Sequence, residues 1–531
     1  MDYHTESEKS NERLLLRIKL PIKSLQKIDA IRIIGGLGII LFVYAYSDVG
    51  QSKPILYDDP SYLDGREVSF FSRRYWLELF MRPVVNLWHP LTVLSHDCLS
   101  EVKLVSIHHV VNMVLHMING VLLHFWIKKL SSDRLIAIST SLIWLLHPVV
   151  VESTAWVSGR KDLLCFCFTV SAMLASLLRN SGLAFTFGLL AVFSKPLAVV
   201  LPLILFVQDI IIAKKDLWDV RAIKSNFKRQ IPLLCISLFC VGYTIFLQSR
   251  GGQGVLDPRN LLEKETSASW ALIQHVSHWL WPKNLRIAYL DPTTLSVIYS
   301  ILGFGFFTVF VVLISSQRTP IAFRVGLCVF FFFLLPTLGF VRAGNSLVAD
   351  RYMYISGVGL TLCVVYPLAK FRKLFLVVLP TILIAFGVLT HKQRSHWKST
   401  EALFLRVISV NPSHSEALSQ LGVLERQKGN DDKAKVYFSK ALMNTGESPI
   451  ANLNLGQYAL EEGRLEQAYN HFIKTLKLRS NEIRLQVLLV KLAWKLEKRD
   501  AARAHLEMVF SLAKTQKERE TAQQLKAMLS Q

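Results

Sequence analysis

Long apolar stretches, separated by short polar ones, dominate the chain between residues 28 and 390. About eleven of these stretches approach the length of an α-helix that crosses a bilayer. They cover residues 28–46, 110–127, 135–151, 163–178, 183–193, 196–213, 231–247, 297–314, 325–341, 353–369 and 374–390. The pattern therefore predicts an all-α fold that begins with a polytopic membrane helix bundle of about eleven spans.

A further apolar stretch, residues 268–281, is interrupted by Gln274, His275 and His278. Short loops rich in Lys and Arg stay on the cytoplasmic side of a membrane. The basic residues of the short loops are Lys128, Lys129, Arg179, those of residues 214–229, Arg318, Arg324 and those of residues 370–373. If the N-terminus is cytoplasmic, all of these basic loops lie on the cytoplasmic side only when residues 268–281 do not cross the membrane. We therefore expect residues 268–281 to form a juxtamembrane or re-entrant helix on the outer side.

Composition supports a membrane protein. Hydrophobic residues make up 51% of the 531 residues and the mean hydropathy is +0.34, which is too apolar for a soluble chain of this length. Seven cysteines, mostly within apolar stretches, indicate free thiols. Residues 1–27 lack the pattern of a cleaved signal peptide, so the first span is expected to be an uncleaved anchor. The sequence thus predicts a cytoplasmic tail (1–27), a transmembrane domain (28–390) and a polar, extracytoplasmic domain (391–531).

The polar C-terminal domain contains an internal repeat. The pairs Gly422 and Gly456, Gly429 and Gly463, Ala434 and Ala468, Phe438 and Phe472, and Leu442 and Leu476 are each 34 positions apart. This spacing is the period of tetratricopeptide (TPR) repeats. A degenerate third copy contains Leu489, Ala502, Leu506 and Phe510, and residues 401–410 supply a lead-in helix. The sequence predicts a short TPR α-solenoid of about three helix pairs, an architecture that generally binds other proteins.

A polar loop of roughly sixty residues, 47–109, follows the first span on the outer side, and long ordered loops are often functional. It contains the adjacent residues Asp58 and Asp59. Neighbouring carboxylates repel, so one of them holds its proton more tightly or is neutralised by a cation, and either condition suits acid/base catalysis. The alternative is an ordinary Asp-Asp-Pro turn. The aromatic run 70–76 in the same loop is expected to lie at the membrane surface.

Four polar residues form a stripe on the span that follows this loop. His109, Asn112, His116 and Asn119 recur at steps of three and four, which places them on one helix face. Polar groups within a membrane are costly unless they pair or line a cavity. Two interpretations remain open, hydrogen bonding between helices and the lining of a cavity. We assign His147 and Glu152 to the same candidate lining.

Four cations lie on the predicted outer side of the membrane, against the cytoplasmic bias of the other short loops. They are Arg160, Lys161, Lys195 and Arg351. An anion that holds them there, such as a lipid phosphate, is one explanation. The competing explanation is ion pairing with Glu152, Asp162 and Asp350.

Several motifs together resemble one known family. They are WHPLTVLSH (88–96), HHVVNMVLH (108–116), LHPVVVES (146–153), GRKD (159–162), SKP (194–196) and DRY (350–352). In this order, and followed by the same kind of repeat, they resemble the transmembrane-and-tetratricopeptide O-mannosyltransferases, especially their bacterial relatives. One departure is Lys195-Pro196, since the eukaryotic members usually have Lys-Glu there.

The resemblance implies a GT-C fold and an enzyme that transfers a sugar from a polyprenyl-phosphate carrier. It also implies that Asp58 and Asp59 are the acidic pair which that family carries in its first outward loop. One Asp would then be the general base of an inverting transfer to Ser or Thr hydroxyls of proteins, with Arg160, Lys161, Lys195 and Arg351 stabilising the departing phosphate. The departure at Pro196 leaves the identity of the sugar and the acceptor open.

The expected partners are the polyprenyl-phosphate sugar, an acceptor protein held by the TPR repeats, and membrane lipid, with no nucleic acid. The donor is a substrate, no cofactor or protein metal site is expected, and a divalent cation remains an option. The expected location is a bacterial inner membrane with the repeats outside, or an endoplasmic reticulum membrane with the repeats in the lumen. The alternatives are a non-catalytic TPR scaffold or assembly factor and a lipid-linked sugar flippase or polymerase, neither of which needs the proton acceptor.

Overall fold

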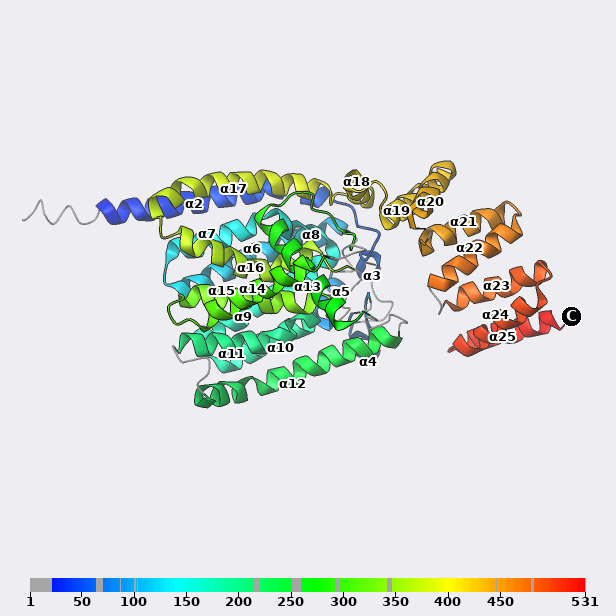
Figure 1. Cartoon of the computed structure of the whole chain (residues 1–531), viewed down its shortest axis with the longest axis horizontal. Helices are drawn as coiled ribbons and strands as arrows, with labels where there is room; N and C mark the ends of the chain where they lie inside the picture. Colours follow the sequence, from blue (N-terminus) through cyan, green and yellow to red (C-terminus); the bar gives the residue numbers. More distant parts are fainter. Residues whose placement is uncertain are drawn as a thin grey trace, which may run out of the picture. The chain divides into compact units, whose positions relative to one another are not determined.

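The computed structural model describes residues 22–63, 70–85, 87–99, 102, 104–213, 220–250, 259–291, 296–340, 346–445, 447–478 and 482–530. Within these residues the regular secondary structure is helical, apart from one isolated bridge between Val84 and Leu87 (Figure 1). The prediction of an all-α membrane bundle followed by a helical repeat is confirmed. The chain divides into two compact units, Met1–Thr400 and Glu401–Gln531.

The first unit is a bundle of long helices and short connecting ones. Its α-helices are α2 (Ile22–Ala45), α3 (Pro60–Leu63), α4 (Arg73–Met81), α5 (Pro90–Asp97), α6 (Val105–Ser131), α7 (Arg134–Leu145), α8 (Val151–Ala155), α9 (Arg160–Leu177), α10 (Ser181–Ser194), α11 (Leu201–Ile212), α12 (Val220–Arg250), α13 (Leu261–Leu280), α14 (Ile298–Ser315), α15 (Ile321–Leu334), α16 (Met353–Leu368) and α17 (Arg372–Ser395). Its 3-10 helices are η1 (Val49–Gln51), η2 (Pro148–Val150), η3 (Val157–Gly159), η4 (Pro196–Val200), η5 (Leu335–Thr337) and η6 (Asp350–Tyr352).

Each of the eleven predicted apolar stretches is helical over most of its length. By length and composition, five helices of the described chain could cross a membrane, and α7 with η2 and α8 forms a sixth candidate that is bent by 52°. Three further apolar helices are shorter: α10, α11 with η4, and α15 with η5. Large apolar side chains such as Ile40 on α2 and Phe304 on α14 are exposed, as expected for surfaces that face lipid.

The core of the bundle is built around α6, α7, α9, α15 and α16, which pack against one another, and α2 lies along α17 (Figure 1). Residues 268–281 fall on α13, whose buried residues include Ala271, His275 and Trp279 and which packs against α14. That these residues do not cross the membrane remains a prediction. Of the predicted tail 1–27, only residues 22–27 are described, as the start of α2.

The bend between α7 and α8 has a local cause. Pro148 has no N–H to continue the helix of α7, and His147 begins the next turn, η2, by accepting a hydrogen bond at Nδ1 from the Val149 N–H, 3.2 Å away. The next turn requires a glycine, because a Cβ on Gly159 would lie 2.2 Å from the Ser153 carbonyl oxygen. These two features fold residues 146–162 into the compact turn that carries several of the candidate site residues.

The second unit is a stack of antiparallel helices preceded by α18 (Thr400–Val410), which begins at the last residue of the first unit. The stack consists of α19 (Ser415–Gln427), α20 (Asp431–Thr445), α21 (Pro449–Glu461), α22 (Leu465–Leu478), α23 (Ile483–Lys495), α24 (Arg499–Leu512) and α25 (Gln516–Leu529). Helices pack in the pairs α19 with α20, α21 with α22, and α23 with α24. The boundary by contacts falls at Thr400, whereas the sequence placed residues 391–400 with the repeats.

The repeated residues explain how each pair packs. A Cβ on Gly422 would lie 2.6 Å from the Phe438 ring, and a Cβ on Gly456 would lie 2.6 Å from the Phe472 ring. In the third pair the equivalent positions hold Val490 and Leu506. Valine is larger than the glycine of the first two pairs, and leucine is smaller than their phenylalanine. The period of 34 residues is thus the period of an interlocking helix pair.

Candidate active site

The predicted acidic pair lies at the start of α3, in a loop that is anchored on several sides. Asp48 forms ion pairs with Arg394 and Lys398. Farther along the loop, the Lys53 N–H donates to the Lys398 carbonyl oxygen, 2.9 Å away, and the Leu56 N–H donates to Thr400 Oγ1, also 2.9 Å away. The loop therefore has a defined path against the segment that follows α17.

Asp59 is completely buried, and both of its carboxylate oxygens accept backbone hydrogen bonds. Oδ2 accepts from the Ile55 N–H at 2.7 Å and Oδ1 from the Ser158 N–H at 3.1 Å. Burial raises the pKa of Asp59 to about 7, the two N–H donors offset part of that rise, and the charge of Asp58 adds to it. Asp59 thus fastens the loop to the turn before α9.

Asp58 is half-buried and interacts electrostatically with Lys161. The Lys161 ammonium donates to Ser158 Oγ at 2.8 Å and lies 5.4 Å from the centre of the Trp156 ring. Lys161 also lies within electrostatic reach of Asp162, Lys195 and Arg351. The structure therefore brings Asp58 and three of the four predicted outer cations together.

Two of these cations form ion pairs with buried acids. Arg351 Nη1 lies 2.5 Å from Glu152 Oε1, and the Arg351 backbone N–H donates to Glu152 Oε2 at 3.2 Å. Lys195 Nζ lies 2.5 Å from Asp162 Oδ1. Each acid side chain is only 1% exposed, whereas Arg351 is 22% and Lys195 12% exposed. The cations are thus the accessible ends of both pairs.

Asp350, the sequence neighbour of Arg351, has a different partner. Its Oδ1 accepts a hydrogen bond from the Tyr289 hydroxyl at 2.7 Å. Burial, together with the charge of Glu152, raises the pKa of Asp350 well above its ordinary value. Of the three acids proposed as alternative partners for the outer cations, Glu152 and Asp162 hold ion pairs with them.

Arg160, the fourth predicted cation, is fully buried and faces protein oxygens and a ring nitrogen. Its Nε donates to Asn112 Oδ1 at 2.9 Å, its Nη1 to the Ser95 carbonyl oxygen at 3.0 Å, and its Nη2 to the carbonyl oxygen and Nδ1 of His108. These contacts tie the start of α9 to α5 and α6. A phosphate role for Arg160 remains a prediction that these contacts do not favour.

The polar stripe of α6 bonds to neighbouring elements. His109 Nδ1 donates to the Ala155 carbonyl oxygen at 2.9 Å, and Asn112 Nδ2 donates to that of Trp156 at 2.8 Å. Farther along α6, Tyr354 of α16 makes hydrogen bonds with both His116 and Asn119. These bonds favour the helix–helix interpretation of the stripe over the cavity interpretation.

His147 and Glu152 also face protein groups. His147 Nε2 donates to the Trp279 carbonyl oxygen at 2.8 Å, and the two rings stack with their centres 3.8 Å apart. Glu152 holds Arg351, as described above. Among the described residues, no group of three or more His, Cys, Asp or Glu side chains is arranged to hold a metal ion.

Several residues of the site were not singled out from the sequence. Tyr62 donates or accepts a hydrogen bond with His89 Nε2 at 2.8 Å, and its ring centre lies 5.8 Å from Lys161 Nζ. Ser158 contacts both Asp59 and Lys161, as described above. Trp156 has the side chains of Lys161 and Arg351 within 6 Å of its ring. Tyr62 follows the acidic pair closely in the sequence, and Ser158 directly precedes the GRKD motif. This proximity in sequence is the signal that could have indicated them.

Comparison with known proteins finds relatives that are named as protein O-mannosyl-transferases. It is 23% identical over 446 residues to the Homo sapiens protein O-mannosyl-transferase TMTC3, a match that covers 74% of this chain and 48% of the relative. The Caenorhabditis elegans protein O-mannosyl-transferase F38B6.6 is 23% identical over 359 residues, or 62% of this chain and 50% of the relative. The Mus musculus TMTC3 protein matches similarly, at 23% over 429 residues, or 70% and 46%.

The chain spans about half the length of the curated relatives that it matches. No family model and no solved structure matches it. The similarity to the curated relatives extends over most of the chain and agrees with the resemblance carried by its motifs. The chain is thus a distant relative of the transmembrane-and-tetratricopeptide (TMTC) family of protein O-mannosyl-transferases.

Proposed function

We propose that this chain is a membrane glycosyltransferase that transfers a sugar, mannose or a related hexose, from a polyprenyl-phosphate carrier to Ser or Thr hydroxyls of extracytoplasmic proteins. The observation that carries the proposal is the half-buried carboxylate of Asp58 beside a group of cations, in a chain related to proteins named as O-mannosyl-transferases. A scaffold would need neither group, and a flippase or polymerase would need only the cations.

In the proposed reaction Asp58 accepts the proton of the attacking hydroxyl. The hydroxyl oxygen forms a bond to the anomeric carbon as the bond from that carbon to the phosphate oxygen breaks on the opposite face, so the configuration inverts. The leaving polyprenyl phosphate carries away the electron pair of the broken bond. Lys161 and the accessible ends of Lys195 and Arg351 stabilise the charge on the phosphate.

Asp58 is the better candidate for the base because it is the accessible member of the acidic pair. Both oxygens of Asp59 already accept backbone N–H groups. A proton acceptor needs an oxygen that can reach the incoming hydroxyl. We therefore assign Asp59 to holding the loop and Asp58 to proton transfer.

The function is tested with the purified chain in proteoliposomes that contain a mannosyl-phosphate polyprenol and a Ser/Thr-rich acceptor peptide. We expect a glycosylated peptide whose anomeric configuration is opposite to that of the donor. In cells, intact-mass analysis of extracytoplasmic proteins with and without the gene should show loss of hexose units. Movement of the lipid-linked sugar across the bilayer without glycosylated peptide would instead indicate the flippase function.

The first prediction concerns orientation. Because the basic short loops predict that residues 391–531 lie outside the cytoplasm, a reporter fused to the C-terminus should be active only if it functions in an extracytoplasmic compartment. Alkaline phosphatase and green fluorescent protein fusions measure the two sides. Fluorescence without phosphatase activity would mean that residues 268–281 cross the membrane and that the assigned sides of the loops after them are inverted.

The second prediction concerns the repeats. We propose that they hold the acceptor protein close to the membrane domain, which raises its local concentration without supplying chemistry. Deletion of residues 415–531 should therefore reduce transfer to a protein acceptor more than transfer to a short peptide. The measurement is the ratio of the two rates in the same preparation, so incomplete folding of the truncated chain affects both alike. An unchanged ratio would show that the repeats do not recruit the acceptor.

A further inference from the structure

A groove of about 530 Å³ lies on the surface of the second unit. Its lining comes from three consecutive helices, α20, α21 and α22, and from the turn before α22. The lining residues are Lys435, Ser439, Leu442, Met443, Leu455, Tyr458, Ala459, Arg464, Gln467 and His471. We call this feature the repeat groove.

The next repeat shows why the groove occurs here. One period of 34 residues later, Tyr469 stands in place of Lys435, and Ile473 stands in place of Ser439. Tyr469 is buried in the core between α22 and α23, and Ile473 packs against the same core. The larger side chains therefore occupy in the later repeat the space that the smaller Ser439 and the flexible Lys435 leave open.

One side of the repeat groove is basic. Lys435 Nζ lies 2.6 Å from Glu462 Oε1, and Arg464 pairs with the other oxygen of the same carboxylate. Two cations thus share one acid, which leaves a net positive charge, and the lining itself contains no Asp or Glu. Since these groups are exposed, each pair contributes only about 0.2–1 kcal/mol. A carboxylate from another molecule can therefore compete with Glu462 for them.

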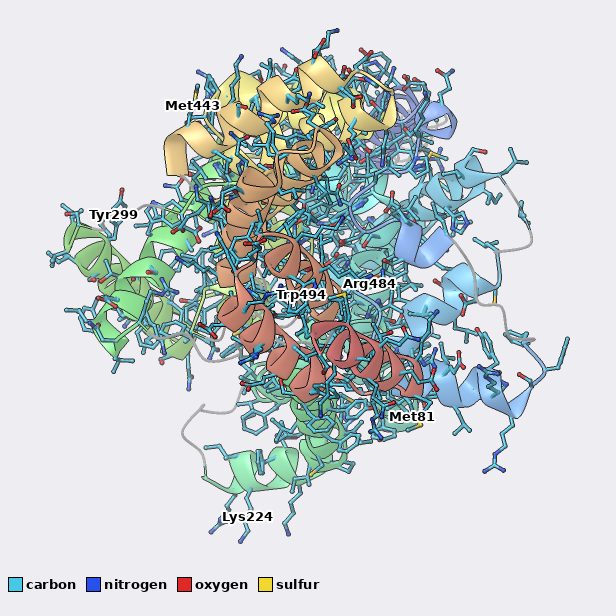
Figure 2. The ribbon with its side chains drawn as sticks, turned by 90° about the vertical axis from the view of Figure 1, so that its right-hand side faces the viewer. Met81, Lys224, Tyr299, Met443, Arg484 and Trp494 are labelled. Carbon is cyan, nitrogen blue, oxygen red and sulfur yellow. The ribbon has the colours of Figure 1, made fainter. Side chains whose placement is uncertain are left out.

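The other side of the repeat groove is apolar. Leu442 and Leu455 are half-buried, and Met443 is 80% exposed at the end of α20 (Figure 2). Met is a flexible and polarizable side chain that adapts to varied partners. The groove thus has an apolar side and a basic side, which match a partner segment that presents an apolar side chain next to a negative charge.

We infer that the repeat groove binds an extended segment of the acceptor protein in which an apolar side chain neighbours an Asp or Glu. The apolar side chain packs against Leu442, Met443 and Leu455, and the carboxylate lies between Lys435 and Arg464. That the bound protein is the acceptor rests on the proposed function, whereas the binding of such a segment rests on the groove alone.

The test uses the full-length chain in nanodiscs with its methionine methyl groups labelled with carbon-13. The probes are two peptides of equal length and identical Gly-Ser-Thr flanks, one with a central Leu-Glu-Asp and the other with a central Leu-Lys-Lys. The Met443 signal is assigned by its disappearance in a Met443→Leu variant. We expect the acidic peptide to shift this signal in a saturable manner and the basic peptide to leave it in place.

Two variants alter the groove without touching the membrane domain. Ser439→Ile introduces the residue found one repeat later and should weaken binding of the acidic peptide about tenfold or more, because the larger side chain occupies the space that the segment would fill. Glu462→Gln removes the competing carboxylate and should strengthen binding roughly two- to fivefold. Ser511→Ile, which places the same residue on the exposed surface of α24, is the matched control and should change nothing.

Equal shifts with both peptides would overturn the inference, as would unaltered binding in Ser439→Ile or weaker binding in Glu462→Gln. The readout is independent of sugar transfer. A chain that binds the acidic peptide but never glycosylates any protein would refute the proposed function and leave the groove assignment intact. A chain that glycosylates proteins but does not bind the acidic peptide would refute the groove assignment and leave the proposed function intact.

Discussion

An Asp58→Asn variant is expected to insert and fold normally yet to transfer sugar about 10² to 10⁴ times more slowly. The amide keeps the size and shape of the carboxylate but cannot accept the proton of the attacking hydroxyl. Because Asp58 is only half-buried, its replacement leaves the backbone contacts of the loop in place. The measurement is the single-turnover rate with saturating donor in proteoliposomes.

Asp59→Asn is the matched control for this variant. An amide NH₂ cannot accept from an N–H group, so one of the bonds from Ile55 and Ser158 is lost at a fully buried site. Loss of such a bond should lower the free energy of unfolding by about 1–3 kcal/mol, which appears as a lower temperature of thermal inactivation. If the Asp58→Asn chain binds donor and transfers sugar at the parental rate, Asp58 is not the base and the flippase or scaffold function takes precedence.

Replacement of Arg351 by Ala is expected to destabilise the membrane domain strongly. Glu152 would remain buried without its partner, and loss of one member of a buried ion pair costs about 3–5 kcal/mol. The second substitution Glu152→Gln removes the stranded charge, so the double variant should recover most of the stability. Thermal inactivation of the single and the double variant, compared with the parent, measures both effects.

The double variant also separates structure from donor binding. If Arg351 contacts the phosphate, the double variant should be stable yet require about tenfold or more donor for half-maximal rate, since a charge-assisted contact is worth ~1.5–3 kcal/mol. Lys195→Ala with Asp162→Asn provides the parallel test on the other ion pair. If both double variants have the parental stability and also need only the parental donor concentration for half-maximal rate, the two cations have a purely structural role.

The helices of the bundle and of the repeats were predictable because each leaves a local pattern. Apolar length marks the spans, and the spacing of Gly422, Phe438 and their repeats marks the solenoid. The extra helix α25 was not predicted, although Thr515 and Glu518 form a capping box that begins it. Its first ten residues contain only two apolar side chains, Ala522 and Leu525, which do not stand out among their polar and charged neighbours.

Motifs in the sequence pointed to the charged residues of the candidate site, but they did not indicate how those residues pair or that Tyr62 and Ser158 join them. Arg351 stands next to Asp350 in the sequence, yet it pairs with Glu152, which is 199 positions away. The tertiary fold determines this pairing, because it places the Tyr289 hydroxyl against Asp350 and Glu152 against Arg351. In the same way, Arg160 shares the outward motif of Lys161 but turns into the protein toward Asn112. The path of the backbone determines which of two adjacent polar side chains points into the protein. The motif alone does not reveal that path.

The interlocking of Gly422 with Phe438 and of Gly456 with Phe472 has a consequence for how the repeat unit of this chain could change in length. In both interfaces a glycine on one helix receives a phenylalanine ring from the next helix. An additional 34-residue unit, duplicated in frame between α19 and α22, could therefore pack against the existing helices on both sides in the same way. The Val490 and Leu506 interface, covered by α25, offers no such match. Growth of the solenoid by tandem duplication is thus favoured at the Gly–Phe interfaces ahead of α23 and disfavoured at the interface between α23 and α24.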